Sequence, residues 1–442
     1  MVLRRWLGWW AVLAPLAAQT EIPSETLVLA RLKNRMASNL SQLPNYTCLQ
    51  TIDRWRRSGP AGWALADILR LEVVMAGNRE LFSWPGAGKF EEKGIGEMVG
   101  GGMSGSGDFG LHARAIFLSQ STSIQLARQE TRPGPAEARY DYRVPPFASG
   151  FEVVVDGKSA TVPYHGSFAV DPETLDLTRL EIVADEIPLD LELSQVRREI
   201  RYGKVRLGES TFLLPQTATT AMISPGGRAS FNRTEYTHCR QFLAEASVRF
   251  VESEPAAAEP ESRAASELPP GVTVEVQLET PIDSHRSALG DAIAAVTARE
   301  ERSNGRLVVP KGAVLAGRIR ALERISNPTP HWVVALEFSN LQLDGRQTRF
   351  FARLEDISPL PGLSRRSPRF PSRIPPSAAE AAPEGRQPDL LGVATFFVRG
   401  TRAQLPRGLR MVWRTVEVSL LARFPQPSKA PPPARIELPQ RR

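Results

Sequence analysis

The chain has 442 residues, of which 42% are hydrophobic and 23% are charged. This composition is typical of globular protein, and the length allows two domains with cores of their own. The net charge is +7. An excess this small argues against a nucleic-acid binder, so we expect no nucleic-acid partner.

Residues 1–19 have the order of a secretory signal peptide. Arg4 and Arg5 precede an apolar run over residues 6–16, and small side chains follow before the sequence turns polar. The apolar run is too short to span a bilayer, and no later stretch reaches that length. We therefore expect an exported protein of the periplasm or the extracellular space, with no transmembrane segment in the mature chain.

The first domain is predicted over residues 20–251 and begins with an amphipathic helix. Ser24 can cap this helix and Pro44 ends it. Its apolar stripe consists of Leu29, Leu32, Met36, Leu40 and Leu43. Strand patterns with short turns then cover 46–55, 69–75, 80–84, 123–129, 138–144, 150–155, 166–170, 175–184, 189–207, 212–222 and 228–242. So many consecutive strands predict an antiparallel meander that must curl.

The segment 89–117, which lies between two of these strands, is rich in glycine. Residues 105–110 match the pattern GxGxxG, but the preceding strand and the βαβ unit that give such glycines a role with nucleotides are missing. A loop leading into a helix over 109–119 is favoured. Asp108 and His112 could share a metal, but without a third ligand Asp108 is better explained as a helix cap. We predict no metal and no cofactor.

Cys48 and Cys239 are the two cysteines of the chain. In an oxidising compartment an even number of cysteines indicates a disulfide, which here would join the first and last strands of the first domain. The rival hypothesis makes Cys239 a nucleophile with His238 as its base. Adjacent residues of a strand point to opposite faces, so the disulfide is favoured.

Several short sequence segments of the first domain resemble those of a known family. They are 43–48 (LPNYTC), 171–180 (DPETLDLTRL), 200–205 (IRYGKV) and 212–215 (FLLP). Together with the leading helix, they resemble the outer-membrane lipoprotein-sorting and lipoprotein-carrier fold over most of residues 22–250. The resemblance implies a curved antiparallel sheet wrapped around a helix, with an apolar cavity on its concave side that holds acyl chains in family members.

One face of the curled sheet supplies candidates for lining such a cavity. These ligand-lining candidates are Leu71, Val73, Phe82, Trp84, Leu180 and Ile182. The alternative is that the same residues pack against the leading helix as an ordinary core.

A linker over 252–267, rich in Ala, Glu and Pro, separates the second domain, which is predicted over 268–424. Its alternating segments with Gly turns predict a small β-barrel. Prolines and arginines fill an insertion over 358–387, and a similar tail covers 425–442; both are predicted to be disordered. The insertion's arginines could contact anionic lipid or simply face solvent. Three short segments of this domain are similar to the β-barrel domain of the TrbI-like conjugation-channel family: 268–271 (LPPG), 289–291 (LGD) and 309–317 (VPKGAVLAG). The resemblance implies the same β-barrel fold.

A search for catalytic motifs finds none. The chain lacks HExxH, GxSxG, a Walker loop and CxxC, and its five histidines are scattered without metal spacing. Adjacent carboxylates such as Asp185 and Glu186 are explained as turn charges, so we predict no catalytic residue.

The overall prediction is a mainly β (α+β) periplasmic protein that binds an apolar or lipidated ligand in its first domain without transforming it. The second domain would attach it to envelope protein partners. One alternative is a structural component of an envelope assembly with no ligand, and a second is an enzyme whose site forms only in the fold.

Overall fold

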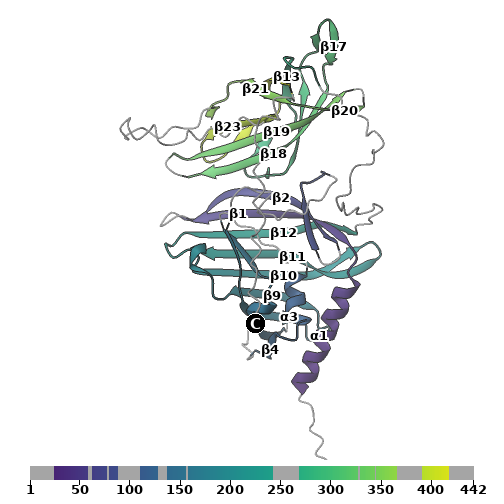
Figure 1. The fold of residues 1–442 in the computed structure, drawn as a ribbon, viewed down its shortest axis with the longest axis vertical. Helices are drawn as coiled ribbons and strands as arrows, with labels where there is room; N and C mark the ends of the chain where they lie inside the picture. Colours follow the sequence, from purple (N-terminus) through teal and green to yellow (C-terminus); the bar gives the residue numbers. More distant parts are fainter. Residues whose placement is uncertain are drawn as a thin grey trace, which may run out of the picture.

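The computed structural model describes residues 24–57, 62–76, 79–87, 110–127, 137–155, 158–241, 268–326, 329–343, 345–365 and 391–417. These residues form two strongly curled antiparallel sheets, one for each half of the chain, and the second is stacked on the first (Figure 1). The predicted fold class is confirmed: a curved antiparallel sheet wrapped on a helix is followed by a small barrel-like sheet.

The first sheet forms a half-barrel, and its strand order follows the chain closely. In spatial order its strands are β3 (Arg79–Ser83), β2 (Ala64–Ala76), β1 (Tyr46–Arg57), β12 (Ala229–Gln241), β11 (Ser210–Ile223), β10 (Gln195–Leu207), β9 (Leu177–Ala184), β8 (Tyr164–Val170), β5 (Ala138–Val144) and β4 (Ser123–Leu126). The helices α1 (Ser24–Gln42) and α3 (Leu111–Phe117) lie against the curled sheet (Figure 1). The hairpin β6 (Glu152–Val155) and β7 (Lys158–Thr161) forms a separate two-stranded sheet.

The apolar stripe predicted for α1 is the face that the helix buries. Leu32, Met36 and Leu40 are buried in the core, while Leu29 and Leu43 pack partly against it. Because the stripe repeats every three to four residues, one side of the helix can contact the sheet along its whole length.

The strand predicted from residue 189 begins later, at Gln195. Leu189–Leu191 forms a short 3-10 turn, η2, which ends at Glu192 with a positive φ of 51°. A second 3-10 turn, η1 (Pro146–Ala148), follows β5. The prediction failed because short apolar runs look alike in a strand and in a tight turn.

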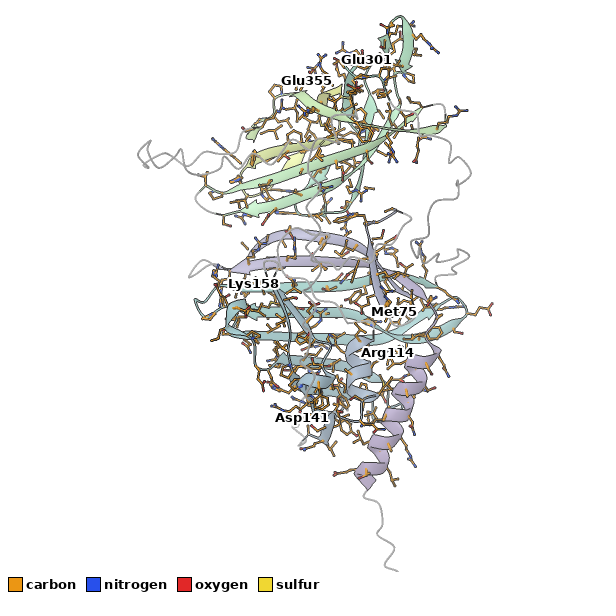
Figure 2. The ribbon with its side chains drawn as sticks, viewed as in Figure 1. Met75, Arg114, Asp141, Lys158, Glu301 and Glu355 are labelled. Carbon is orange, nitrogen blue, oxygen red and sulfur yellow. A yellow bond between two sulfur atoms is a disulfide. The ribbon has the colours of Figure 1, made fainter. Side chains whose placement is uncertain are left out.

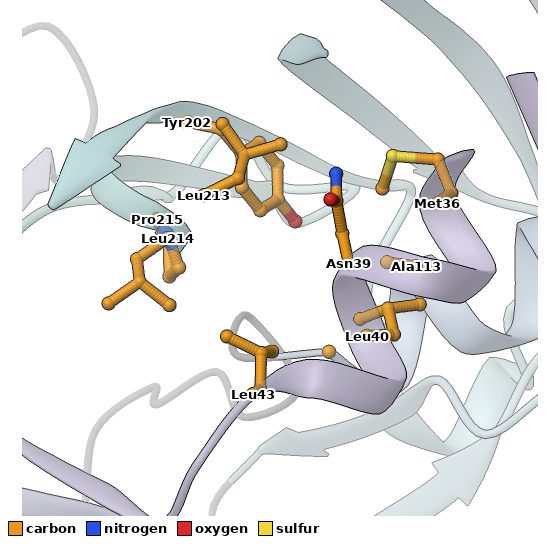
Figure 3. Close-up of a pocket in the computed structure, with 10 residues that line it drawn as sticks. Met36, Asn39, Leu40, Leu43, Ala113, Tyr202, Leu213, Leu214 and Pro215 are labelled. Atoms are coloured by element: carbon orange, nitrogen blue, oxygen red, sulfur yellow. The ribbon is translucent and has the colours of Figure 1, made fainter. Parts of the chain in front are cut away.

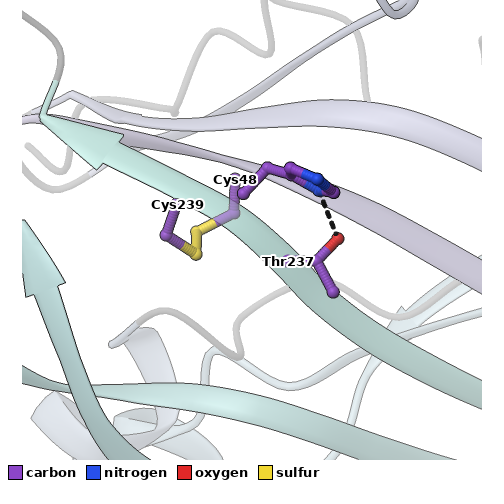
Figure 4. The surroundings of a disulfide bond; sticks show 4 residues. Cys48, Thr237 and Cys239 are labelled. Atoms are coloured by element: carbon purple, nitrogen blue, oxygen red, sulfur yellow. Dashed lines mark hydrogen bonds between the residues drawn. A yellow bond between two sulfur atoms is a disulfide. The ribbon is translucent and has the colours of Figure 1, made fainter.

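The disulfide prediction is confirmed. Cys48 and Cys239 are bonded, with their Cα atoms 4.1 Å apart, and they join β1 to β12 (Figure 4). Opposite Cys48, β12 carries one extra residue, and His238 there has a φ of 51°. Such a bulge re-aims a neighbouring side chain. Since Cys239 is bonded, it is no nucleophile, and the imidazole Nδ1 of His238 instead contacts the Thr237 hydroxyl at 3.0 Å.

The second sheet curls until its two edges meet. In spatial order it contains β21 (Ala352–Ile357), β25 (Arg410–Thr415), β13 (Thr273–Leu278), β15 (Ala292–Thr297), β18 (Val314–Ile325), β19 (His331–Leu343), β23 (Val393–Arg399) and β22 (Leu363–Ser364), and β20 (Arg346–Arg349) pairs with β19. Arg365, directly after β22, donates from Nη2 to the Leu354 carbonyl of β21 at 2.8 Å. Two short ribbons complete the domain: β14 (Ile282–Asp283) with β24 (Gln404–Leu405), and β16 (Glu301–Ser303) with β17 (Arg306–Val309).

The predicted insertion falls only partly on described residues. Residues 358–365 are described and include β22, whereas residues 366–387, the linker, the tail and the leader lie outside the described residues. The domain boundaries therefore stay predictions. None of the described helices is long and apolar enough to cross a membrane.

The turn Leu289–Asp291 of the second domain docks on an edge of the half-barrel. Strand β3 pairs only with the last part of β2, from Glu72 onward. On the earlier part of β2, the Leu289 N–H donates to the Ile68 carbonyl at 2.7 Å, and the Arg70 N–H donates to the Leu289 carbonyl at 2.8 Å. The Leu289 side chain belongs to the first domain's core. The second domain thus extends the hydrogen bonding of the first.

Side chains around this turn strengthen the junction. Both carboxylate oxygens of Asp291 lie 2.7 Å from Nη1 of Arg70. Trp84 lies beneath the turn, and the guanidinium of Arg318 is 5.8 Å from the centroid of its ring. These contacts join the domains without using the predicted linker.

Asp283 in the second domain gives a pH-dependent prediction. Its carboxylate accepts from Nε of Arg402 at 2.7 Å and from the backbone N–H of His285. The side-chain hydrogen bond from Arg402 is the main cause that lowers the pKa of Asp283 from 3.8 to about 2. A carboxyl group whose pKa is lowered by folding stabilises the folded state at pH values above its pKa in the unfolded chain. This stabilisation is lost as the pH falls through the pKa of the folded state.

We therefore expect Asp283→Asn to lower the free energy of unfolding at pH 6. The deficit should shrink between pH 4 and pH 2, because Asp283 of the unfolded wild-type chain binds a proton there while the folded chain does so only near pH 2. Urea denaturation at a series of pH values measures the difference. A wild-type advantage that stays undiminished at pH 2 would contradict this assignment.

Candidate functional site

The concave face of the half-barrel presents a band of mostly apolar side chains. Residues that pair across neighbouring strands point to the same face, so the register defines rows that cross the sheet. One such row, here named the apolar row, consists of Leu69, Ile52, Thr234, Ala218, Ile200, Leu180, Phe168 and Tyr140. All of these residues are buried. A largely apolar surface, with Thr234 as its polar member, therefore lines the curled sheet.

The structure brings most of the predicted lining residues to this interior. Leu71 and Val73 of β2 are buried in the first domain's core, together with Phe82 of β3. Leu180 and Ile182 of β9 enter the same core from the far side of the half-barrel and are 0% exposed. These residues are distant in sequence, and it is the curl of the sheet that gathers them.

Trp84, the sixth candidate, has two sets of neighbours. It packs partly against the core and also contacts Gly290 and Arg318 of the second domain. It therefore lies at the junction of the two domains.

A small cavity of about 20 Å³ lies where α1 meets the sheet (Figure 3). Its lining is Met36, Asn39, Leu40, Leu43, Gly110, Ala113, Tyr202, Leu213, Leu214 and Pro215. This volume holds about one water molecule. Asn39 is the polar group of α1 that faces it, and its Nδ2 is buried without a hydrogen-bond partner among the described residues. A ligand of any size must therefore displace protein from this region.

The helices over the cavity are held by few polar contacts. Arg35 of α1 pairs with Asp176 at 3.2 Å, and its side chain is 49% exposed. Lys204 pairs with the same carboxylate. Nη2 of Arg114 in α3 donates to the Leu40 carbonyl at 3.3 Å. Most of the attachment is apolar burial.

Tyrosines add neutral hydroxyls to the interior. The Tyr142 hydroxyl donates to the Glu181 carbonyl at 2.8 Å, across Gly166 on the strand between them. A Cβ on Gly166 would lie 1.9 Å from that carbonyl oxygen, so this position accepts only glycine. Burial raises the pKa of Tyr142 and of Tyr164 above the usual value, so both phenols are neutral at physiological pH.

A second row next to the apolar row is polar, and the sequence analysis missed it. This polar row consists of Asp67, Arg54, Asn232, Thr220 and Arg198, paired in register across β2, β1, β12, β11 and β10. Every member is buried. Alternation places each member at an inward position of its own strand, but only the pairing between strands brings the members into one row.

Hydrogen bonds organise the polar row. Arg54 and Asp67 form a bidentate ion pair, with Nη2 to Oδ2 at 2.7 Å. Nη1 of Arg198 donates to the Thr220 hydroxyl at 2.8 Å. The row thus contains two guanidinium groups and one carboxylate.

On the convex face, His165 and Asp185 form a pair beside a shallow hollow of about 470 Å³. Nδ1 of His165 lies 2.7 Å from the carboxylate, which Arg143 also approaches at 3.4 Å. Asp185 is therefore part of an ion cluster and not merely a solvated turn charge. Ser167 in the same hollow contacts Glu181 at 3.4 Å, and no hydrogen bond joins it to His165 in the structure.

No group of metal-ligating side chains lies together among the described residues. His112, one of the two residues weighed as ligands, packs edge-to-face on the rings of Phe151 and Tyr164. Of the GxGxxG pattern, the structure describes Gly110, which lies directly before α3. Asp108 and the other two glycines lie outside the described residues.

No family model matches this chain, and no curated protein matches it at a significant level. Two solved structures are similar to it. One is a LolA superfamily protein from Nitrosomonas europaea, with 11% identity over 49% of this chain and 94% of that chain, and a TM-score of 0.26. The other is a DUF1329 family protein from Desulfovibrio piger, with 11% identity over 50% of this chain and 94% of that chain, and a TM-score of 0.25. Both TM-scores are far below 0.5, so the fold described above rests on this chain's own strand pairings.

Proposed function

We propose that this chain is an exported, non-enzymatic protein that binds an apolar or acylated ligand on the concave face of its half-barrel. The observation that carries the proposal is the apolar row, which crosses eight strands under α1 and α3 and is apolar at every position except Thr234 of β12. The disulfide supports export, because such bonds persist in oxidising compartments such as the periplasm.

The ligand would replace the helices as cover for this face. The buried side chains of α1 and α3 contact the sheet mainly through apolar groups. An acyl chain offers about 0.8 kcal/mol for each CH₂ that it buries, so a chain of ordinary length can compensate for a displaced helix face. In this proposal the acyl chain lies along Leu71, Val73, Phe82, Leu180 and Ile182.

A second candidate function follows from the small cavity. The described interior is filled, and a filled core favours a structural role in an envelope assembly with the second domain as the attachment module. Ligand binding separates the two candidates, since a purely structural half-barrel has no reason to accept an acyl chain.

The test is titration of the delipidated full chain with a fluorescent polyene fatty acid. We expect saturable binding at micromolar concentration. Leu213→Asp, a half-buried cavity residue on β11, should weaken binding at least about tenfold, since a charge beside the chain is costly to desolvate.

Leu118→Asp is the matched control. Leu118 is 43% exposed and follows α3 without lining the cavity, so its substitution should leave binding unchanged. Circular dichroism checks that both variants are folded. A folded wild-type chain that shows no saturable binding would refute the proposal and favour the structural role.

A further inference from the structure

A polar hollow of about 550 Å³ adjoins the small cavity under α1. Asn39 of α1 and Leu213 of β11 line both spaces, and Figure 3 shows them on opposite sides of the cavity. Nη2 of Arg114, which is labelled in Figure 2, donates to the Leu40 carbonyl of α1 and marks this end of the half-barrel. The hollow therefore lies where a ligand that enters the cavity would leave its outermost group.

An ion triad forms one wall of the hollow. It joins Arg35 of α1, Asp176 directly before β9 and Lys204 of β10. Nη2 of Arg35 lies 3.2 Å from Oδ1 of Asp176, and Nζ of Lys204 lies 3.2 Å from Oδ2. The Asp176 side chain is only 8% exposed, whereas those of Arg35 and Lys204 are 49% and 62% exposed. A solute in the hollow therefore meets the two cations before it meets the carboxylate.

The triad leaves hydrogen-bond donors free for a ligand. Arg35 donates to Asp176 from Nε and Nη2, so its Nη1 has no partner among the described residues. The Lys204 ammonium has more N–H donors than its one contact with Asp176 can use. Because Asp176 already holds both side chains in place, an anion can bind them with little further loss of side-chain entropy.

Asn39 supplies a further donor at the boundary between the hollow and the cavity. Its Nδ2 is buried and has no hydrogen-bond partner among the described residues. An unpaired buried amide is costly, so a ligand oxygen that accepts from this Nδ2 is favoured. The hollow thus offers donors both at its mouth and at its inner end.

The apolar row continues from the cavity. Tyr202 of β10 lines the cavity, and Ile200 of the apolar row lies two residues earlier on the same strand, about 7 Å away. An extended acyl chain that starts in the hollow can therefore pass Leu213 and reach the apolar row beneath α1.

Resting on the proposed function, we propose that this hollow binds the anionic head group of the ligand, a carboxylate or a phosphate, at Arg35 and Lys204. The guanidinium fork matches two oxygens of either group, and the ammonium adds a second positive charge. The Asn39 amide donates to an oxygen next to the acyl chain, and the chain itself lies under α1.

The test measures displacement of a neutral probe, a pyrene-labelled fatty alcohol, from the delipidated full chain. The competitors have equal chain length and are a fatty acid, a monoalkyl phosphate and a monoacylglycerol. We expect at least one anion to displace the probe at concentrations about tenfold or more below the monoacylglycerol, because charge-assisted hydrogen bonds form with its head. Which anion does so distinguishes a carboxylate from a phosphate source. The preference should shrink at about 0.5 M salt, which screens partly exposed cations.

Arg35→Gln and Lys204→Gln should each lower the preference for the anion over the monoacylglycerol about threefold or more, since one cation of the pair is lost. Each variant keeps the other cation beside Asp176, so the carboxylate is not left unpaired. Asn39→Leu keeps a side chain of similar size without the donor and should also lower the affinity for the anion. An unchanged affinity in Asn39→Leu would remove the amide from the site.

The matched control is Arg31→Gln. Arg31 lies one turn before Arg35 on α1, is exposed and does not line the hollow, so its substitution should leave the preference intact. Equal displacement by charged and neutral competitors in the wild type would overturn the head-group site alone. A preference that survives unchanged in both Arg35→Gln and Lys204→Gln would do the same. Failure of the neutral probe to bind would overturn the proposed function with it.

Discussion

Replacing Gly290 by valine is expected to separate the two domains. Gly290 has a φ of +98°, and a Cβ there would lie 2.4 Å from the Arg70 carbonyl oxygen and 2.7 Å from the Trp84 ring. No L side chain fits without moving the turn away from β2. The displaced turn would withdraw Leu289 from the first domain's core, and losing a buried leucine typically costs about 2–5 kcal/mol.

Calorimetry of the full chain provides the measurement. We expect a single cooperative transition for the wild type and two for Gly290→Val, because domains that share backbone hydrogen bonds and a core residue unfold together. Gly312→Val is the matched control: its φ of +82° imposes similar backbone strain, but no atom lies within 4 Å of the added Cβ. One unchanged transition in Gly290→Val would show that the turn does not couple the domains.

Removing the disulfide should have the second large effect. The bond between Cys48 and Cys239 spans a sequence separation of 191 residues. In the chain-entropy model a closed loop of this length contributes about 5 kcal/mol by constraining the unfolded chain. We expect the double variant Cys48→Ala, Cys239→Ala to lose much of this amount in urea denaturation. Alanine is used because Cys48 is buried and a serine hydroxyl would need a partner.

Reduction of the wild type supplies the control for this prediction. Dithiothreitol should lower the wild-type free energy of unfolding toward that of the double variant and leave the variant unchanged. Peptide mapping without reductant should recover the two cysteines in one linked fragment. Two free thiols in protein purified from an oxidising compartment would contradict the assignment.

Local sequence patterns were sufficient to predict many of the individual helices and strands. The strand predicted over 138–144 matches β5 residue for residue, and the helix predicted between Ser24 and Pro44 corresponds to α1. These predictions are correct because the hydrophobic period, the capping residues and the turn residues all act over a few neighbouring positions.

The candidate site depended on information that no local pattern holds. Asp67, Arg54 and Arg198 occupy ordinary inward positions in three different strands, and each alone resembles a solvated charge. Their alignment follows from the register of β2, β1, β12, β11 and β10, including a shift between Arg54 and Trp55. A slip of one residue in any pairing would place the charged group on the other face.

Residue spacing alone accounts for the alternation that makes each sheet two-faced, for the stripe that buries α1 and for the cysteine pair that could close the first domain. By contrast, the residues of Leu289–Asp291 look like an ordinary turn, and their pairing with the edge of β2 is visible only in the fold. Only the fold, likewise, filled the concave face with protein and collected the polar row at one end of it. The reason is physical: pairing between distant strands is set by the whole sheet's packing and register, which a short segment of sequence does not encode.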